Sequence, residues 1–276
     1  MLSLHDVSAR RRAFRQLHQS GCFVIPNPWD PGSALYLQQL GFKALATTSS
    51  GAAWRHARAD GQMSVEETLA HFREMVAATR LPVNADFEAG FAADAVGVAR
   101  NVRLAVDTGV AGLSIEDSTG DASEPLRDIV SSVERMRAAR SAIDGAGGET
   151  LLVGRAENFI VGRPDLGDAI RRLRAYAEAG ADCLYAPGIT TREQIAAVVA
   201  AVAPKPVNLL IGFAAELTLR DIEALGVRRI SVGGALARTA WGGFMRAAHM
   251  IAAEGKFDGL AGAAAGAELN GLMRKG

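Results

Sequence analysis

The sequence predicts a barrel of eight parallel β-strands, each followed by a helix, and three observations lead to this fold class. The chain has 276 residues, 49% of them hydrophobic, which is enough to enclose one large core. Short apolar runs alternate with segments of helical apolar spacing across roughly 250 residues, which is typical of an α/β protein of the (β/α)8 or TIM-barrel type. Four helical stretches also end at a glycine with a new apolar run close behind it. We therefore expect a single domain, residues 1–276, with its barrel at about residues 21–250.

The four glycine phrases predict helix-to-strand corners, because glycine readily adopts the left-handed backbone conformation that ends a helix. Further strand-like runs bring the number of strands to eight. Between strands, apolar residues share one helical face, as at Leu69, Phe72 and Val76 and again at Leu173 and Tyr176. The corners fall at residues 40–45, 108–113, 179–184 and 225–230, and the further strands at residues 22–25, 81–85, 151–154 and 206–211.

The same alternation is compatible with an open, doubly wound sheet, because strand order cannot be seen in a sequence. The absence of a G-x-G-x-x-G segment after any predicted strand disfavours that alternative. The chain beyond the barrel, about residues 251–276, is rich in alanine and glycine. We expect this extension to be helical and either to cap the barrel or to pack on a neighbouring subunit.

Composition narrows the class of partner. Thirty basic residues balance thirty acidic ones, so no net field favours nucleic acid or an anionic membrane. The longest apolar run, residues 195–203, is about half of the ~18 residues that a membrane span requires. The arginine-rich start of the chain lacks the apolar block of a signal peptide, so we expect a cytoplasmic protein with a small-molecule partner. Cys22 and Cys183 are expected to be reduced core thiols.

The strand ends deliver acidic residues to the expected barrel mouth. Asp86 and Glu88 end the third strand, and Glu116 and Asp117 end the fourth. Four neighbouring carboxylates repel one another unless a cation or protons intervene, and oxygen-only ligands favour Mg2+, with Mn2+ possible, over zinc. The alternative is that these acids cap the following helices, which for Asp117 alone is an equally good interpretation.

Groups that could bind an organic acid face the same mouth. Arg155 ends the fifth strand, where its guanidinium can grip a carboxylate in two places; its alternative role is an ion pair with Glu157 or Glu116. The four lysines lie away from the predicted mouth, which disfavours Schiff-base chemistry. The second strand ends in a turn of hydroxyls and accessible N–H groups, and the eighth strand leads to a further basic residue; these candidates are Thr48, Ser49, Ser50, Gly51 and Arg238.

Three segments together, D-F-E-A-G-F at 86–91, S-I-E-D at 114–117 and G-R-A-E-N at 154–158, resemble the isocitrate lyase and phosphoenolpyruvate mutase superfamily. The resemblance implies a (β/α)8 barrel with a Mg2+ site, assembled as a homo-oligomer, a dimer or tetramer, with the C-terminal helix exchanged between subunits. It further implies that Asp86 holds the metal, with Glu88 and Glu116 binding directly or through water. By the same resemblance, Arg155 binds the substrate carboxylate, and Thr48, Ser49 and Ser50 hold the 2-oxo acid. The resemblance also implies that Asp60 lies near the reacting carbon and that Asn208 contacts the substrate.

The sequence departs from this superfamily in the segment after the fourth strand. Residues 118–128 contain neither the cysteine of the lyases' K-K-C-G-H loop nor the lysine of the phosphonopyruvate branch, and Pro187 stands where the lyases tend to have glutamate. These differences disfavour isocitrate and methylisocitrate cleavage. The nearest resemblance is to uncharacterised members with a D-x-E-A-G-[FY] segment.

The functional hypothesis is a Mg2+-dependent enzyme that makes or breaks a carbon–carbon bond of a small 2-oxo or 2-hydroxy carboxylate through an enolate, of lyase or decarboxylase type. Asp60, Glu116 and Arg155 are the candidate catalytic residues. Two alternatives remain: an enzyme acting on the carbon–phosphorus bond of a phosphonopyruvate-like substrate, and a non-catalytic protein that binds 2-oxo acids.

Overall fold

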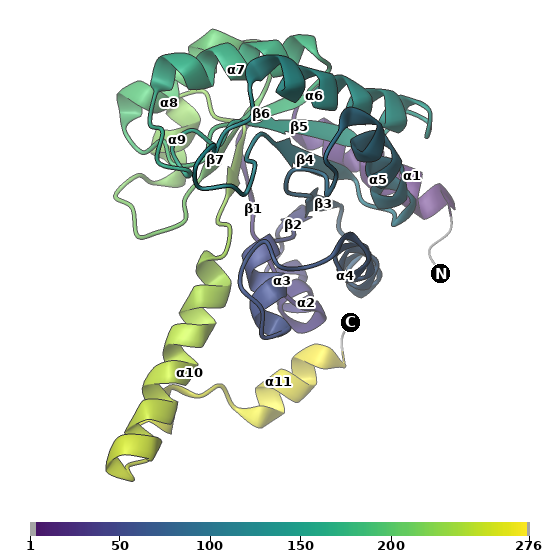
Figure 1. The fold of residues 1–276 in the computed structure, drawn as a ribbon. Helices are drawn as coiled ribbons and strands as arrows, with labels where there is room; N and C mark the ends of the chain where they lie inside the picture. The colour runs from purple at the N-terminus through teal and green to yellow at the C-terminus, as the bar shows by residue number, and fades with distance from the viewer. Residues whose placement is uncertain (1–3, 275–276) are drawn as a thin grey trace.

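The computed structural model describes residues 4–274 and confirms the barrel (Figure 1). Eight parallel strands follow one another in the order β1-β8-β7-β6-β5-β4-β3-β2. No ladder joins β1 to β2, but the Ala46 N–H donates to the Pro26 carbonyl across that gap at 3.0 Å, so the barrel is nearly closed. The strands are β1 (Phe23–Ile25), β2 (Leu45–Ala46), β3 (Val83–Asp86), β4 (Gly112–Glu116), β5 (Leu151–Arg155), β6 (Cys183–Tyr185), β7 (Val207–Leu210) and β8 (Arg229–Ser231).

Helices cover the outside of the strands, and the predicted corners are confirmed. Gly41, Gly109, Gly180 and Gly226 all have left-handed backbone angles, with φ of 87°, 92°, 105° and 86°. The helices that follow strands are α2 (Pro31–Gln39), α3 (Ser49–Arg55), α4 (Val65–Ala78), α5 (Ala95–Asp107), α6 (Ile129–Asp144), α7 (Leu166–Glu178), α8 (Arg192–Val202), α9 (Leu219–Ala224) and α10 (Ala235–Glu254).

An N-terminal helix, α1 (Leu4–Leu17), packs against the amino-terminal ends of the strands. Phe14 is fully buried there against Ile25 and Leu151. The guanidinium of Arg11 donates to the carbonyls of Val106 and Val110, which anchors α1 to the end of α5 and the start of β4. This helix therefore closes the end of the barrel that lies opposite the expected site.

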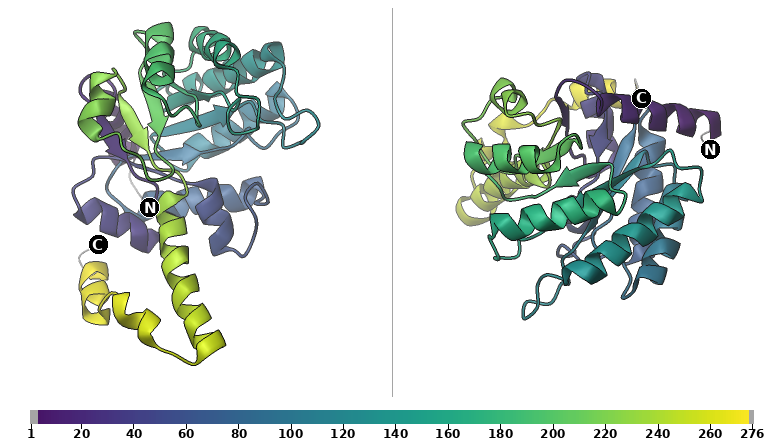
Figure 2. Two further views of the ribbon diagram at one scale, coloured as in Figure 1. Left: turned by 90° about the vertical axis from the view of Figure 1, so that its left-hand side faces the viewer. Right: turned by 90° about the horizontal axis from the view of Figure 1, so that it is seen from above.

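The C-terminal part of the chain leaves the barrel. Figures 1 and 2 show α10 projecting away from the strands, after which a 3-10 helix, Asp258–Gly262, and α11 (Gly266–Met273) turn back. The Gln39 side chain donates to the Leu272 carbonyl at 2.9 Å, so α11 rests on α2. α10 runs through residue 250, the predicted end of the barrel, without a break. Within residues 4–274, none of the helices combines the length and apolar character that crossing a membrane requires.

The placement predicted for Asp117 at the barrel mouth is wrong, and so is its alternative role as a helix cap. Asp117 is buried behind the strands, where it accepts hydrogen bonds from the Glu157 N–H at 2.8 Å, from Arg172 at 3.0 Å and from the Tyr176 hydroxyl at 2.6 Å. Asp128 caps α6 instead. Side chains alternate along a strand, so Glu116 faces the barrel interior and its neighbour faces outward.

This buried network should stabilise the fold without taking part in catalysis. Tyr176→Phe removes one hydrogen bond to a buried carboxylate and should lower the free energy of unfolding by about 1.5–3 kcal/mol. Asp117→Ala leaves Arg172 short of one buried counter-charge and should cost about 3–5 kcal/mol. Urea denaturation measures both, and Tyr36→Phe at an exposed site is the matched control. A Tyr176→Phe protein as stable as the unmodified protein would contradict the assignment.

Candidate active site

The carboxyl ends of the strands surround a cavity of about 150 Å3 that reaches into the barrel interior. A wider recess of about 540 Å3 adjoins it on the side of the loops after β3, β4 and β5. Ser49, Asp60 and Arg155 line both spaces, so the cavity and the recess form one site. The structure thus brings together side chains from β2, β3, β4 and β5, as the sequence predicted for a barrel mouth.

Arg155 is the centre of the site. Its Nη1 atom lies 3.2 Å from Asp86 Oδ1 and 3.2 Å from Glu116 Oε2, and its Nε atom donates to Glu157. Its guanidinium also lies 5.1 Å from the centre of the Tyr185 ring. Burial by itself would lower the pKa of Arg155, but Glu157 and Glu116 hold it well above its usual value. Arg155 is therefore a permanent cation that faces the cavity.

The predicted metal-binding acids converge on this cation. The Asp86 carboxylate accepts a hydrogen bond from the Ser49 N–H at 3.1 Å, and Glu116 accepts one from the Ser118 hydroxyl. Burial, followed by the charges of Asp86 and Glu116, raises the pKa of Glu88 to about 8. Burial also raises the pKa of Glu116. Burial is the main cause of both shifts, and repulsion from the neighbouring carboxylates adds to it.

Glu88 has an unusual backbone conformation. Its φ is 46°, in the left-handed region that a residue with a side chain seldom adopts. The Glu88 carbonyl accepts a hydrogen bond from the Glu116 N–H at 3.0 Å, which fixes the loop after β3 against β4. Such strain persists only where surrounding contacts determine it, and it is concentrated at functional sites. Here it places the Glu88 side chain on the wall of the recess.

The acids fit a hydrated hard cation better than an enclosed metal centre. Within residues 4–274 no three His, Cys, Asp or Glu side chains are spaced so that they enclose an ion. Mg2+, however, commonly keeps several waters and takes only one or two protein carboxylates. Asp86 and Glu116 supply oxygen donors, and Glu88 lies beside the same recess. The donor chemistry therefore suits Mg2+ or Mn2+, bound in part through water.

The turn after β2 forms one wall of the cavity. Thr48 caps α3, and its hydroxyl lies 3.0 Å from that of Ser50. Gly51 lies behind this wall; a side chain there would come within 2.8 Å of Trp29 Cβ, so the residue must be small. Asp60, on the exposed loop after α3, reaches the rim of both spaces. Partial burial raises the pKa of its carboxyl group, opposed by a hydrogen bond with Ser49.

Two predicted substrate contacts have other partners in the structure. Asn208 lines the inner cavity but is fully buried, and its amide donates to Ser231 and accepts from Arg229. Arg238 is not brought to the cavity wall: its guanidinium donates to the Gly212 carbonyl and lies 4.3 Å from the Phe213 ring centre. Substrate contact by either residue stays a prediction.

Sequence reasoning missed several residues of this site. Glu157 was considered only as a partner of Arg155, yet its pKa is raised to about 8, chiefly by burial. Tyr185 and Arg229 also line the cavity and were not identified. Their signal is positional: each lies on the inward face of a short strand, which becomes visible only once the strand register is known.

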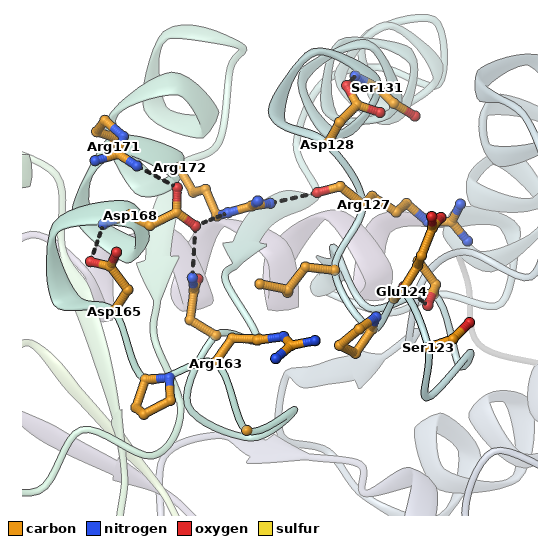
Figure 3. Close-up of a pocket in the computed structure, with 16 residues that line it drawn as sticks. Ser123, Glu124, Arg127, Asp128, Ser131, Arg163, Asp165, Asp168, Arg171 and Arg172 are labelled. Carbon is orange, nitrogen blue, oxygen red and sulfur yellow. Dashed lines mark hydrogen bonds and ion pairs between the residues drawn. The ribbon is translucent and has the colours of Figure 1, made fainter.

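A larger recess of about 940 Å3 lies outside the mouth, between the loops after β4 and β5 and the first turns of α6 and α7 (Figure 3). Its central acid, Asp168, is already bound by Arg171, Arg172 and Asn158. None of the predicted site residues lines this recess. Its charges neutralise one another, so it lacks the unbalanced carboxylates that distinguish the barrel mouth.

Comparison with known proteins points to the same superfamily as the three sequence segments. The family model described as phosphoenolpyruvate phosphomutase matches residues 14–252. An oxaloacetate decarboxylase from Bradyrhizobium sp. (strain ORS 278) is 32% identical over 231 residues, which cover 81% of this chain and 77% of that protein. A crystal structure from Burkholderia cenocepacia J2315, of a protein provisionally classed as a lyase/mutase, matches with a TM-score of 0.94 and 45% identity, covering 98% of each chain.

A phosphonopyruvate hydrolase, solved in complex with oxalate and Mg2+, matches with a TM-score of 0.84 and 26% identity over 96% of each chain. The extent of the family match and the identity to the decarboxylase confirm the resemblance inferred from the three sequence segments. The chain belongs to the phosphoenolpyruvate mutase and isocitrate lyase superfamily of enzymes.

Proposed function

We propose that this protein is a Mg2+-dependent enzyme that cleaves a carbon–carbon bond of a small 2-oxo or 2-hydroxy carboxylate through an enolate, as a decarboxylase or a lyase. The observation that carries the proposal is the convergence of Asp86 and Glu116 on Arg155 where the inner cavity meets the wider recess, with 3.2 Å between the guanidinium and each carboxylate. The relatives that are oxaloacetate decarboxylases support this class of reaction.

Each side chain has a role that follows from its position. Arg155 binds and orients the substrate carboxylate, and the turn that contains Ser49 and Ser50 binds the oxygens of the 2-oxo acid. Asp60 at the rim holds or moves a proton at the reacting carbon. Asp86, with Glu88 and Glu116, would hold Mg2+ directly or through water. When bound, this ion lowers the energy of negative charge that develops on the substrate oxygen.

The metal site can be tested by Asp86→Ala. The change removes the carboxylate that contacts both Arg155 and the turn after β2, so we expect Mg2+ binding to be lost and turnover to fall at least about 100-fold. Calorimetric titration with Mg2+ and a mass-spectrometric screen of 2-oxo and 2-hydroxy acids measure the two effects. Asp107→Ala, on an exposed face of α5, is the control and should change neither. Unchanged turnover in the Asp86 variant would refute the site.

The reaction class can be tested with two substrates side by side. Oxaloacetate and phosphonopyruvate share the 2-oxo carboxylate that Arg155 would bind, but they differ in the bond to be broken. We expect Mg2+-dependent loss of oxaloacetate and no release of phosphate from phosphonopyruvate. Phosphate release would instead support carbon–phosphorus cleavage, which the phosphonopyruvate hydrolase match makes the second candidate. Tight Mg2+-dependent binding of oxalate without turnover of any acid would indicate a binding protein.

We further propose that the chain forms a homo-oligomer through α10. Of the twenty residues of this helix only Ala237 is buried, although Trp241, Phe244 and Met245 are large and apolar. Trp241 and Phe244 stack edge to face and, with Trp29, border an apolar groove of about 320 Å3. An exposed apolar helix face of this length is typical of an interface between copies.

Phe244→Ser combined with Met245→Ser should therefore convert the oligomer to single chains, because two large apolar contacts are lost. Light scattering coupled to size-exclusion chromatography gives the mass. Val130→Ser, at an equally exposed position on α6, should leave the mass unchanged. A monomeric unmodified protein would rule out the proposed assembly.

A further inference from the structure

The floor of the cavity contains a second arginine that the proposed mechanism does not use. Arg229 begins β8, is 3% exposed, and lines the same 150 Å3 cavity as Arg155. Its Nε atom donates to Asn208 Oδ1 at 2.8 Å. Its Nη1 atom lies at the longer distances of 3.4 Å from Asn84 Oδ1 and 3.5 Å from His18 Nε2.

All of these partners are neutral. Within residues 4–274 no carboxylate lies within 4 Å of the Arg229 guanidinium, whereas the buried Arg172 and the cavity-lining Arg155 both have carboxylate partners. His18 supplies no negative charge, and its pKa is lowered to about 3, first by burial and then by Arg229 itself. A buried cation without a counter-charge is costly, and an anion in the adjoining cavity would offset that cost.

The position of Arg229 suits the far end of a small substrate. Asn84 and Asp86 both face the barrel interior on β3, two residues apart, which is roughly 6.6 Å along the strand. Arg229 contacts Asn84, and Arg155 contacts Asp86. The two guanidinium groups therefore lie at successive layers of one cavity, so a substrate that spans both layers can reach each of them.

The charges at the two layers differ. Asp86, Glu116 and Glu157 surround Arg155, so the mouth repels a second negative charge on the substrate. The inner layer has the amides of Asn84 and Asn208 around Arg229, and none of the described acids forms an ion pair with this guanidinium. A substrate with two carboxylates can therefore place one at Arg155 and the other at the floor.

We propose that Arg229 binds the second carboxylate of the substrate and selects 2-oxo or 2-hydroxy dicarboxylates over the corresponding monocarboxylates. This inference rests on the proposed function, because it assumes that the first carboxylate binds at the mouth. Asn208 and Asn84 act as positioning residues: the Asn208 amide donates to Ser231, which directs its oxygen toward the guanidinium.

The test compares three unreactive or slowly reacting ligands by calorimetric titration in the presence of Mg2+. Malate and lactate both carry a 2-hydroxy carboxylate, and malate adds the second carboxylate; oxalate is too short to reach the floor. We expect the unmodified protein to bind malate at least about tenfold more tightly than lactate. Arg229→Met should reduce the affinity for malate to that for lactate and leave the affinity for oxalate unchanged. Arg229→Lys, which keeps the charge, should retain part of the preference.

Arg228→Met is the matched control. Arg228 is the neighbour on the chain, is half-buried, and donates to the Gly21 carbonyl outside the cavity.

If the unmodified protein binds oxalate but binds malate and lactate with equal affinity, the inference is overturned and the proposed function stays intact. An Arg229→Met protein that loses oxalate and malate equally would assign Arg229 a purely structural role. If Arg229→Met does not fold, the malate-to-lactate ratio of the unmodified and Arg229→Lys proteins decides. Absence of oxalate binding to the unmodified protein would refute the proposed function itself.

Discussion

The site depends on one electrostatic constraint: a single permanent cation, Arg155, is shared by Asp86, Glu116 and Glu157. One positive charge cannot neutralise three buried negative ones, and the pKa of Glu157 is accordingly raised to about 8, chiefly by burial. The arrangement is stable only if protons or another cation share the space. A cation at the mouth would relieve the repulsion and release Arg155 to face an anionic substrate, so in the proposed function metal binding and substrate binding would be coupled through the same carboxylates.

The barrel interior contains two layers of polar side chains. Barrel cores are ordinarily filled by branched apolar side chains in layers. Here apolar packing is concentrated outside the strands and at their amino-terminal ends, where Phe14 of α1 fills the barrel. Above it lies a polar layer made by Asn84, Asn208 and the cation Arg229, and above that the layer of the mouth, which contains the acids. This order gives the cavity its depth, because hydrogen-bonded amides leave room that close-packed leucine or isoleucine would occupy.

Much of the fold could be predicted, because its signals are local. Glycine at the end of four predicted helices indicates a left-handed corner from local sequence alone, as at Gly109 and Gly180. The acids that end β3 and β4 were predicted for a similar reason, since parallel strands meet at one edge. The prediction for Asp117 was wrong because side chains continue to alternate between the two faces of the sheet beyond the end of the strand. Asp117 follows the inward-facing Glu116 and therefore points behind the sheet. Arg229 was missed because the inward face of β8 is fixed by its register with β1 and β7.

The loop after β4 bears on which bond is broken. Ser118 of this loop binds Glu116, and Ser118 also pairs with Leu126 in a short bridge, so the loop closes on itself beside the mouth. Its sequence provides no thiol or amine that could protonate a leaving group. Aldol-type cleavage of a 2-hydroxy acid needs one group to take the hydroxyl proton and another to protonate the enolate that is released. In decarboxylation carbon dioxide departs without the bonding electrons, so only the remaining enolate has to receive a proton. In the proposed mechanism that proton would come from Asp60, which lines both the cavity and the recess. On this ground we propose decarboxylation ahead of aldol-type cleavage.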